Sequence, residues 1–251
     1  MRIGVIGTGT IATATVQGIA ADGHDILVST RGRENAHHLC TAFENVDTAE
    51  NQAVLDESNV VLLGLMPDVA RAVLPGLAFR AQQRVISLMA GVGLGELSRL
   101  VAPAIVEAIA IPFPSIAQGG APVMVCPKSQ LADDIFGQAN HPFFLHDEAA
   151  LQAFTAAQAV LSPSLKLLEL AAGWLAKRTH DAPQAESFMR LLVGSSLLSP
   201  PLDQPDVLAK TLSALNTAGG YNRELREFML ERGMEQALND GLDQLEKRGQ
   251  S

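Results

Sequence analysis

The sequence predicts an α/β fold: a Rossmann-like, doubly wound and mostly parallel sheet followed by an all-α C-terminal domain. Three observations support this prediction. Short β-branched runs alternate with amphipathic stretches from Arg2 to about Leu145, a glycine-rich turn follows the first run, and only helical periodicity remains after about Glu148. Strands that alternate with helices on this spacing are typical of βαβ units. We therefore expect one domain over residues 1–147 and a second, helical domain over residues 148–251.

The predicted strands are short runs rich in β-branched residues, at positions 3–6, 25–29, 60–65, 84–89, 105–110, 123–126 and 143–145. Helical periodicity predicts helices over residues 11–20, 68–77 and 94–100, and a further helix after the second strand carries His37 and His38. In the second half, apolar residues at helical spacing lie within residues 167–175, 188–198 and 234–245. A proline-rich loop at 199–205 separates the last two of these helical segments.

Composition limits the possible classes of function. Of the 251 residues, 47% are hydrophobic and 18% charged, which is typical of a globular chain. The formal charge of −9 argues against nucleic acid as a partner, because phosphate-backbone binding needs clustered Lys and Arg. No run approaches the roughly 20 apolar residues of a membrane span, so no membrane partner is expected. The two cysteines, Cys40 and Cys126, indicate neither a disulfide framework nor a metal site, and they favour a cytoplasmic location.

The first predicted strand leads into a G-x-G-x-x-A turn, Gly7-Thr8-Gly9-Thr10-Ile11-Ala12, which opens a predicted helix. The first glycine permits a tight turn, and the second lets the backbone approach a pyrophosphate. The helix N-terminus then faces the negative charge. The alternative is a glycine turn with no ligand. Because the turn lies between a predicted strand and helix, dinucleotide binding is the preferred interpretation.

The end of the second strand indicates which dinucleotide. NAD-binding domains usually place Asp or Glu there to hold the ribose hydroxyls. This chain has Ser29, Thr30 and Arg31, followed by Arg33, and no carboxylate until Glu34. Hydroxyl and guanidinium groups suit a ribose 2′-phosphate. NADP(H) is therefore the expected cofactor, and an ordinary solvated basic loop is the alternative.

Four further segments share the order and spacing of one family. They are Val60-Val61-Leu62-Leu63-Gly64-Leu65-Met66-Pro67, Ala90-Gly91-Val92-Gly93-Leu94, Ile111-Pro112-Phe113-Pro114 and Thr217-Ala218-Gly219-Gly220-Tyr221-Asn222. They resemble the V-K-P, A-G-V-x-L, M-P-N-T-P and S-P-G-G-T-T segments of the pyrroline-5-carboxylate reductases, over nearly the whole chain. Met66 replaces the usual lysine, and the asparagine of the third segment is missing. The resemblance implies an NADP-dependent oxidoreductase of proline biosynthesis. The cofactor contacts that it implies are Asn51, Gly64, Leu65, Met66, Pro67 and Ala90.

The resemblance also implies a site for the chemistry. The family transfers a hydride to the carbon of a cyclic imine, and its S-P-G-G-T-T loop supplies hydrogen-bond donors. By position, Thr217, Tyr221 and Asn222 are the catalytic candidates here, and Gly219, Gly220 and Gln158 would line the substrate. Tyr221 is much larger than the family's threonine, and packing between helices is an equal alternative for it. In the family, the helical half forms an intertwined dimer, so a homodimer or a dimer-based oligomer is expected.

The changed pocket positions leave the function open among three hypotheses. The leading one is an NADPH-dependent reductase of a small substrate, a cyclic imine as in pyrroline-5-carboxylate reductase. The second is a reductase of another small substrate, resembling deazaflavin-dependent NADP reductases. The third is a non-catalytic NADP(H)-binding regulatory protein that has lost the chemistry.

Overall fold

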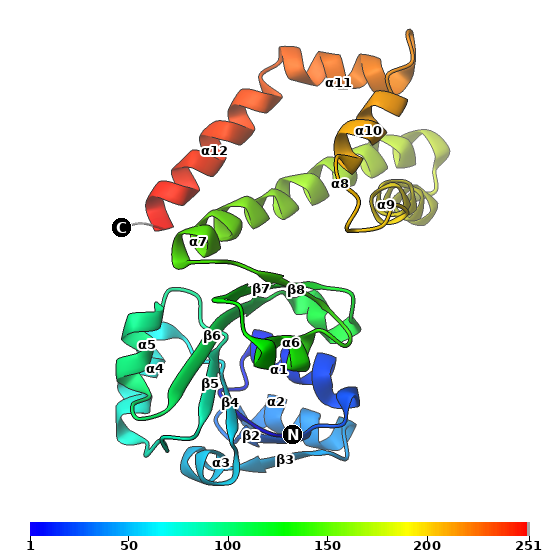
Figure 1. Ribbon diagram of the computed structural model, residues 1–251. Coiled ribbons are helices and arrows are strands. Elements are labelled where there is room, and N and C mark those ends of the chain that lie inside the picture. Colours follow the sequence, from blue (N-terminus) through cyan, green and yellow to red (C-terminus); the bar gives the residue numbers. More distant parts are fainter. Residues whose placement is uncertain (250–251) are drawn as a thin grey trace. The chain divides into compact units, whose positions relative to one another are not determined.

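The computed structural model of the chain describes residues 1–249, which divide into two compact units (Figure 1). The first unit is Met1–Leu151 and the second is Gln152–Ser251. All strands belong to the first unit, and the second is helical throughout its described part. The predicted α/β sheet with an all-α region after it is confirmed.

The first unit is built on one eight-stranded sheet in the order β3-β2-β1-β4-β5-β6-β7-β8. The strands are β1 (Arg2–Ile6), β2 (Asp25–Ser29), β3 (Val46–Ala49), β4 (Val60–Leu63), β5 (Arg84–Ser87), β6 (Ile105–Pro112), β7 (Pro122–Cys126) and β8 (His141–Phe144). Strands β1 to β6 run parallel, β7 is antiparallel to β6, and β8 is parallel to β7. Strand order reverses between β1 and β4, as in a doubly wound fold.

Helices cover both faces of this sheet. They are α1 (Thr10–Ile19), α2 (Arg33–Ala42), α3 (Asn51–Glu57), α4 (Pro67–Val73), α5 (Leu94–Leu100) and α6 (Gln130–Phe136). Buried residues of α1, α2 and α6 form one core with alternate residues of the strands, and those of α3, α4 and α5 form the other. Because successive strand residues point to opposite faces, β4 contributes Leu62 to the first core and Val61 to the second. All four residues of β4 are buried, as expected for a central strand.

The structure corrects several predicted elements. Strand β3 and helices α3 and α6 were not predicted, because β3 has only four residues and α3 and α6 have seven each. Strands β4 and β5 end two residues earlier than predicted, and β6 extends two residues further, to Pro112. The helix predicted over 68–77 ends at Val73 and passes into a 3₁₀ turn, since Pro75 cannot continue an α-helix.

The second unit contains long helices with little buried surface. They are α8 (Leu161–Thr179), α9 (Ala182–Leu198), α10 (Val207–Ala214), α11 (Tyr221–Glu231) and α12 (Met234–Gly249), while α7 (Glu148–Ala157) crosses the boundary between the units. Helices α8 and α9 pack against each other. Among residues 152–249, only Ala172 and Ala185 are buried.

One helical stretch, Glu148–Thr179, is long and apolar enough by length and composition to cross a membrane, which the count of apolar residues in the sequence did not anticipate. Core helices of soluble proteins meet the same criterion when they are mostly buried, whereas the apolar window of this stretch is 0% buried, and a single such helix is weak evidence. Within this stretch Lys166 forms an ion pair with Glu169 at 2.5 Å, and α8 packs on α9. The composition therefore gives only weak evidence for a membrane span.

Candidate cofactor site

The predicted cofactor residues gather at one edge of the sheet. Each lies at or just after the carboxyl end of a parallel strand: Gly7, Thr8, Gly9, Thr10 and Ile11 after β1, Ser29, Thr30 and Arg31 at β2, Asn51 after β3, Gly64, Leu65, Met66 and Pro67 after β4, and Ala90 after β5. The carboxyl ends of parallel strands share an edge, and ligands of doubly wound sheets bind there, where the strand order reverses. That reversal lies between β1 and β4.

The backbone conformation and the packing at position 7 both require a glycine. Its φ is +91°, a conformation that L side chains rarely adopt, and an added Cβ would lie 2.5 Å from the Gly64 carbonyl oxygen. Its N–H donates to Ser29 Oγ at 2.8 Å. The turn after β1 is thus fixed against the loops that follow β4 and β2.

At position 9, neither the backbone conformation nor the packing requires a glycine. Its φ of −71° is open to any residue, and an added Cβ would meet nothing closer than the Gly64 carbonyl oxygen at 4.0 Å. Gly9 is exposed and directly precedes α1. A glycine that neither backbone conformation nor packing requires leaves open space above its Cα. That space is what a pyrophosphate in contact with the backbone needs.

The N-terminus of α1 is open to an anion. No side chain caps it, and its first turn carries no acidic residue. The first N–H groups of a helix have no partner inside the helix, and the helix dipole adds partial positive charge there. Thr10, at the first position, is exposed. Together with the open space at Gly9, this end of α1 fits the diphosphate of a dinucleotide.

The loop after β2 contains both buried and exposed residues. Ser29 is fully buried, and its hydroxyl is used within the protein by Gly7. Thr30 donates to Glu50 Oε1 at 2.8 Å. Arg31 and Arg33 are exposed, and within residues 1–249 neither side chain forms an ion pair. The two guanidinium groups are therefore the ones available to a 2′-phosphate.

Two residues of this loop region were missed from the sequence. Asn35 donates to the Thr8 carbonyl oxygen at 2.6 Å, and Glu50 brings a carboxylate from the end of β3 to Thr30. Both contacts join segments that are distant in sequence. Glu50 lies 20 residues beyond Thr30, and the unpredicted strand β3 brings it there. A sequence signal for β3 would have placed Glu50 beside Thr30.

The loops after β4 and β5 add apolar surface to the same edge. Met66, which directly precedes α4, is 73% exposed, and Ala90 is also exposed. Gly64 packs so closely on α1 that an added Cβ would lie 2.5 Å from Ala12 Cβ. The loop after β4 is thereby held next to the turn after β1, with Met66 facing solvent.

The predicted catalytic and substrate residues belong to the second unit. Thr217 to Gly220 form a tight turn, in which the Gly220 N–H donates to the Thr217 carbonyl oxygen at 3.0 Å, and α11 begins at Tyr221. Thr217 and Asn222 are exposed, and Tyr221 is 90% exposed. Tyr221 therefore has little packing within its own chain, and its packing between helices of an oligomer stays a prediction. Gln158 is exposed too, in the 3₁₀ turn between α7 and α8.

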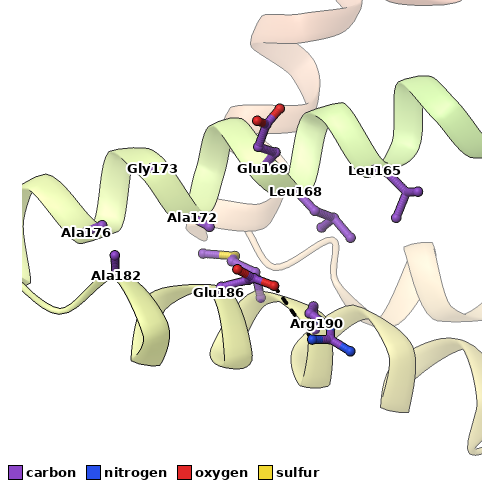
Figure 2. A pocket seen from close by; sticks show the side chains of 10 residues that line it. Leu165, Leu168, Glu169, Ala172, Gly173, Ala176, Ala182, Glu186 and Arg190 are labelled. Carbon is purple, nitrogen blue, oxygen red and sulfur yellow. Dashed lines mark ion pairs between the residues drawn. The ribbon is translucent and has the colours of Figure 1, made fainter.

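The second unit also has an open apolar groove of about 430 Å³ between α8 and α9 (Figure 2). Leu165, Leu168 and Ala172 line it from α8, and Glu186 and Arg190, an ion pair at 3.6 Å, lie along its α9 side. None of the predicted site residues lines this groove. It therefore carries no argument for the chemistry.

Comparison with known proteins bears on both units. Residues 2–91 match the family described as NADP oxidoreductase, coenzyme F420-dependent. No curated protein matches the chain by sequence.

Solved structures match along the whole chain. A 1-pyrroline-5-carboxylate reductase from Streptococcus pyogenes has a TM-score of 0.81 at 21% identity, covering 99% of this chain and 98% of its own. A pyrroline-5-carboxylate reductase from Coxiella burnetii has a TM-score of 0.84 at 17% identity, covering 99% of this chain and 97% of its own. Pyrroline carboxylate reductase from Plasmodium falciparum, solved with NADP bound, has a TM-score of 0.82 at 15% identity, covering 99% of this chain and 97% of its own. The chain therefore has the fold of the pyrroline-5-carboxylate reductases over both of its units.

Proposed function

We propose that this chain is an NADPH-dependent reductase that transfers a hydride to the C=N bond of a small cyclic imine. The observation that supports it best is the edge of the sheet around Gly9, where open backbone, an uncapped helix and two exposed arginines meet the chemical needs of NADP(H). The fold supports the same class, since it is shared along the whole chain with structures described as pyrroline-5-carboxylate reductases.

The first unit would hold the cofactor. The N–H groups at the start of α1 bind the diphosphate, Arg31 and Arg33 bind the 2′-phosphate, and Met66 and Ala90 offer apolar surface to a ring. Bound NADPH supplies a hydride from its nicotinamide ring. The protein's contribution to such a reaction is to position the acceptor and to support the developing charge.

The second unit would support the substrate nitrogen. Reduction of an imine adds a hydride at carbon and a proton at nitrogen, so a hydrogen-bond or proton donor must reach that nitrogen. Asn222 can donate through its amide and Tyr221 through its phenol, while Thr217 keeps the hydroxyl of the family's serine. Because Tyr221, Asn222 and Gln158 depart from the family's residues, the preferred imine can differ from pyrroline-5-carboxylate.

Cofactor choice is the first test. We expect NADPH to bind more tightly than NADH, and Arg31→Ala to weaken NADPH binding by about 1.5–3 kcal/mol, the usual range for a hydrogen bond to a charged group. Calorimetric dissociation constants for both cofactors measure this. Arg99→Ala, which removes an exposed arginine at the far end of α5, is the matched control. Equal affinities of the wild type for NADPH and NADH would refute the assignment.

The substrate is the second test. NADPH oxidation is followed with a panel of five- and six-membered cyclic imines and with keto acids. Turnover of cyclic imines supports the proposal. The match of residues 2–91 to a family described as coenzyme F420-dependent favours one other candidate, a reductase linked to a deazaflavin. Oxidation of NADPH only when oxidised coenzyme F420 is present would select that candidate. Cofactor binding without any turnover would indicate a regulatory protein.

A further inference from the structure

Thr8 holds together the two loops on which cofactor choice depends. It occupies the second position of the G-x-G turn, on which dinucleotide binding places no demand. Yet its side chain is almost fully buried, with 2% exposed. Its hydroxyl donates to the Arg31 carbonyl oxygen at 2.9 Å and has a longer contact of 3.3 Å with the Gly32 carbonyl oxygen. The side chain is thus directed toward the arginine loop.

The backbone of Thr8 is held from the other side. Its carbonyl oxygen accepts a hydrogen bond from Asn35 Nδ2 at 2.6 Å, and Asn35 lies in the first turn of α2, directly after the arginine loop. We refer to Thr8 and Asn35 as the clasp. It connects the turn after β1 to the loop before α2 through one hydroxyl and one amide.

Gly32 makes this close contact possible. Its φ is +106°, and an added Cβ would lie 2.5 Å from Thr8 Oγ1. Gly32 separates Arg31 from Arg33, so its position against Thr8 fixes the backbone that carries both arginines. The guanidinium groups themselves are exposed, but the chain from which they extend is anchored.

A fixed distance between these two loops is what discrimination requires. The diphosphate and the 2′-phosphate of NADP(H) are attached to the same ribose, so covalent structure limits their separation. A protein that binds both must hold its two anion sites at a matching separation. NADH lacks the second phosphate, and its binding does not depend on where the arginines lie.

We propose that the clasp of Thr8 and Asn35 sets the preference for NADPH over NADH by positioning the arginine loop, without either side chain contacting the cofactor. This inference rests on the proposed function, because it assumes that the arginines bind the 2′-phosphate. Loss of the clasp lets the loop move. Binding of NADPH must then order the loop again, and this cost weakens the binding of NADPH but not that of NADH.

The decisive variant is Thr8→Val, which keeps the shape of the side chain and removes its hydroxyl. NADPH and NADH dissociation constants are measured by calorimetry for this variant, for Thr8→Ser, and for Thr15→Val as control. Thr15 is a buried threonine of α1 whose hydroxyl donates to the Ile11 carbonyl oxygen at 2.8 Å. Thr8→Val raises the dissociation constant for NADPH by about three- to tenfold, the equivalent of one neutral hydrogen bond, and changes that for NADH less than twofold. Thr8→Ser and Thr15→Val keep the wild-type preference.

A double-mutant cycle distinguishes positioning from a general structural role. In a background that carries both Arg31→Ala and Arg33→Ala, Thr8→Val has little further effect on NADPH binding, because both groups that it positions are gone. Additive effects, equal weakening of NADH, or unchanged affinities would each overturn the proposal. Asn35→Ala tests the other half of the clasp if Thr8→Val does not fold. A wild type without preference for NADPH refutes the proposed function itself, and this result is visible before any variant is made.

Discussion

Tyr221 is the single tyrosine of the chain, and its ring has almost no contact within that chain. It lies two residues after Gly219, whose φ is +69°, and it begins α11. An aromatic ring that is 90% exposed is an unusual feature for a residue without a binding role, since buried contacts usually justify the size of such a side chain. We expect a ligand or a second copy of the chain to contact it.

We predict that Tyr221→Phe lowers kcat and kcat/KM together and leaves the NADPH dissociation constant unchanged. A donor that acts mainly in the transition state produces this pattern, and its loss costs about 2–4 kcal/mol of barrier. Steady-state kinetics with the best imine of the substrate panel measures the change. The phenylalanine keeps the ring, so any packing of the ring is preserved.

Asn222→Ala is the companion variant, and Asn239→Ala its control, because Asn239 is an exposed asparagine of α12. Full activity of Tyr221→Phe with a slow Asn222→Ala would make the amide the donor to the substrate nitrogen. Normal turnover of both variants would show that the loop at 217–222 has no catalytic role in this protein.

Among the secondary-structure elements, α1 owes its position to one glycine within the helix. Gly18 lies in the last turn of α1, where an added Cβ would lie 2.2 Å from the carbonyl oxygen of Ile116. Ile116 belongs to the 3₁₀ turn Pro114–Gln118, which follows β6 and packs on α1. The glycine lets two backbones approach, and so the helix that offers its N-terminus to the cofactor is seated by contacts at its other end.

We predict that Gly18→Ala destabilises the first unit by about 1–3 kcal/mol, the usual cost of overpacking a tight site. Urea unfolding followed by circular dichroism measures the change. Gly95→Ala is the matched control, because Gly95 lies in α5 with nothing within 4 Å of its added Cβ. That control should be neutral or slightly stabilising, since alanine favours helix. Equal effects of the two substitutions would contradict the packing argument.

The β5–β6 pair contains a second structural device. Register shifts between Val85 and Ile86, which leaves Glu107 as the extra residue of a bulge in β6. Glu107 binds Arg84 at 2.6 Å and accepts a hydrogen bond from Ser129 at 3.3 Å, at the start of α6. The hydrogen bond from Arg84 and its positive charge lower the pKa of Glu107, with a smaller contribution from Ser129, against the opposing effect of burial.

We predict that this pair makes the first unit sensitive to acid. Because the folded pKa of Glu107 lies below its unfolded value of about 4.3, its contribution to stability is present above that pH and is lost as the pH falls through the folded pKa. Arg84 is partly exposed, which limits the effect to about 1 kcal/mol or less. Urea unfolding between pH 6.5 and 3.5 should therefore show a flatter pH dependence for Glu107→Gln. Glu57→Gln, which breaks an exposed pair with Arg2, should keep the wild-type slope.

Local signals made much of the fold and the position of the candidate cofactor site predictable. The glycine turn and the ends of β2, β4 and β5 lie in short segments whose residue types favour one local conformation. Strand β3 escaped prediction because it is a short edge strand with the polar residues Asp47 and Thr48 at its centre. Asn35 and Glu50 escaped because their partners are distant in sequence. The substrate side could be inferred only by resemblance, since exposed loops carry little periodicity.

For the whole molecule, the second unit poses a problem of stability. Many of its large apolar residues are exposed, among them Leu191 at 71% and Leu198 at 74%, on one stripe of α9. Two buried alanines do not make a core for about 100 residues, because folding must offset a large loss of chain entropy. Surfaces of this kind mark contacts with another protein, a membrane or a ligand. A second copy of the chain is the partner that we expect.

We predict that the purified protein is a dimer, or an oligomer built from dimers, with a mass that is an even multiple of 26.5 kDa by light scattering. Leu191→Lys places a charge on the stripe of α9 and should shift the mass toward the monomer, with loss of helix stability, because a charge buried at an interface has no partner. Ile105→Lys is the control, since Ile105 is an exposed apolar residue of the first unit, 52% accessible at the start of β6. It should leave the mass unchanged. A wild-type monomer at micromolar concentration with fully folded helices would show instead that the second unit is stable alone, and the exposed stripe would then need another partner.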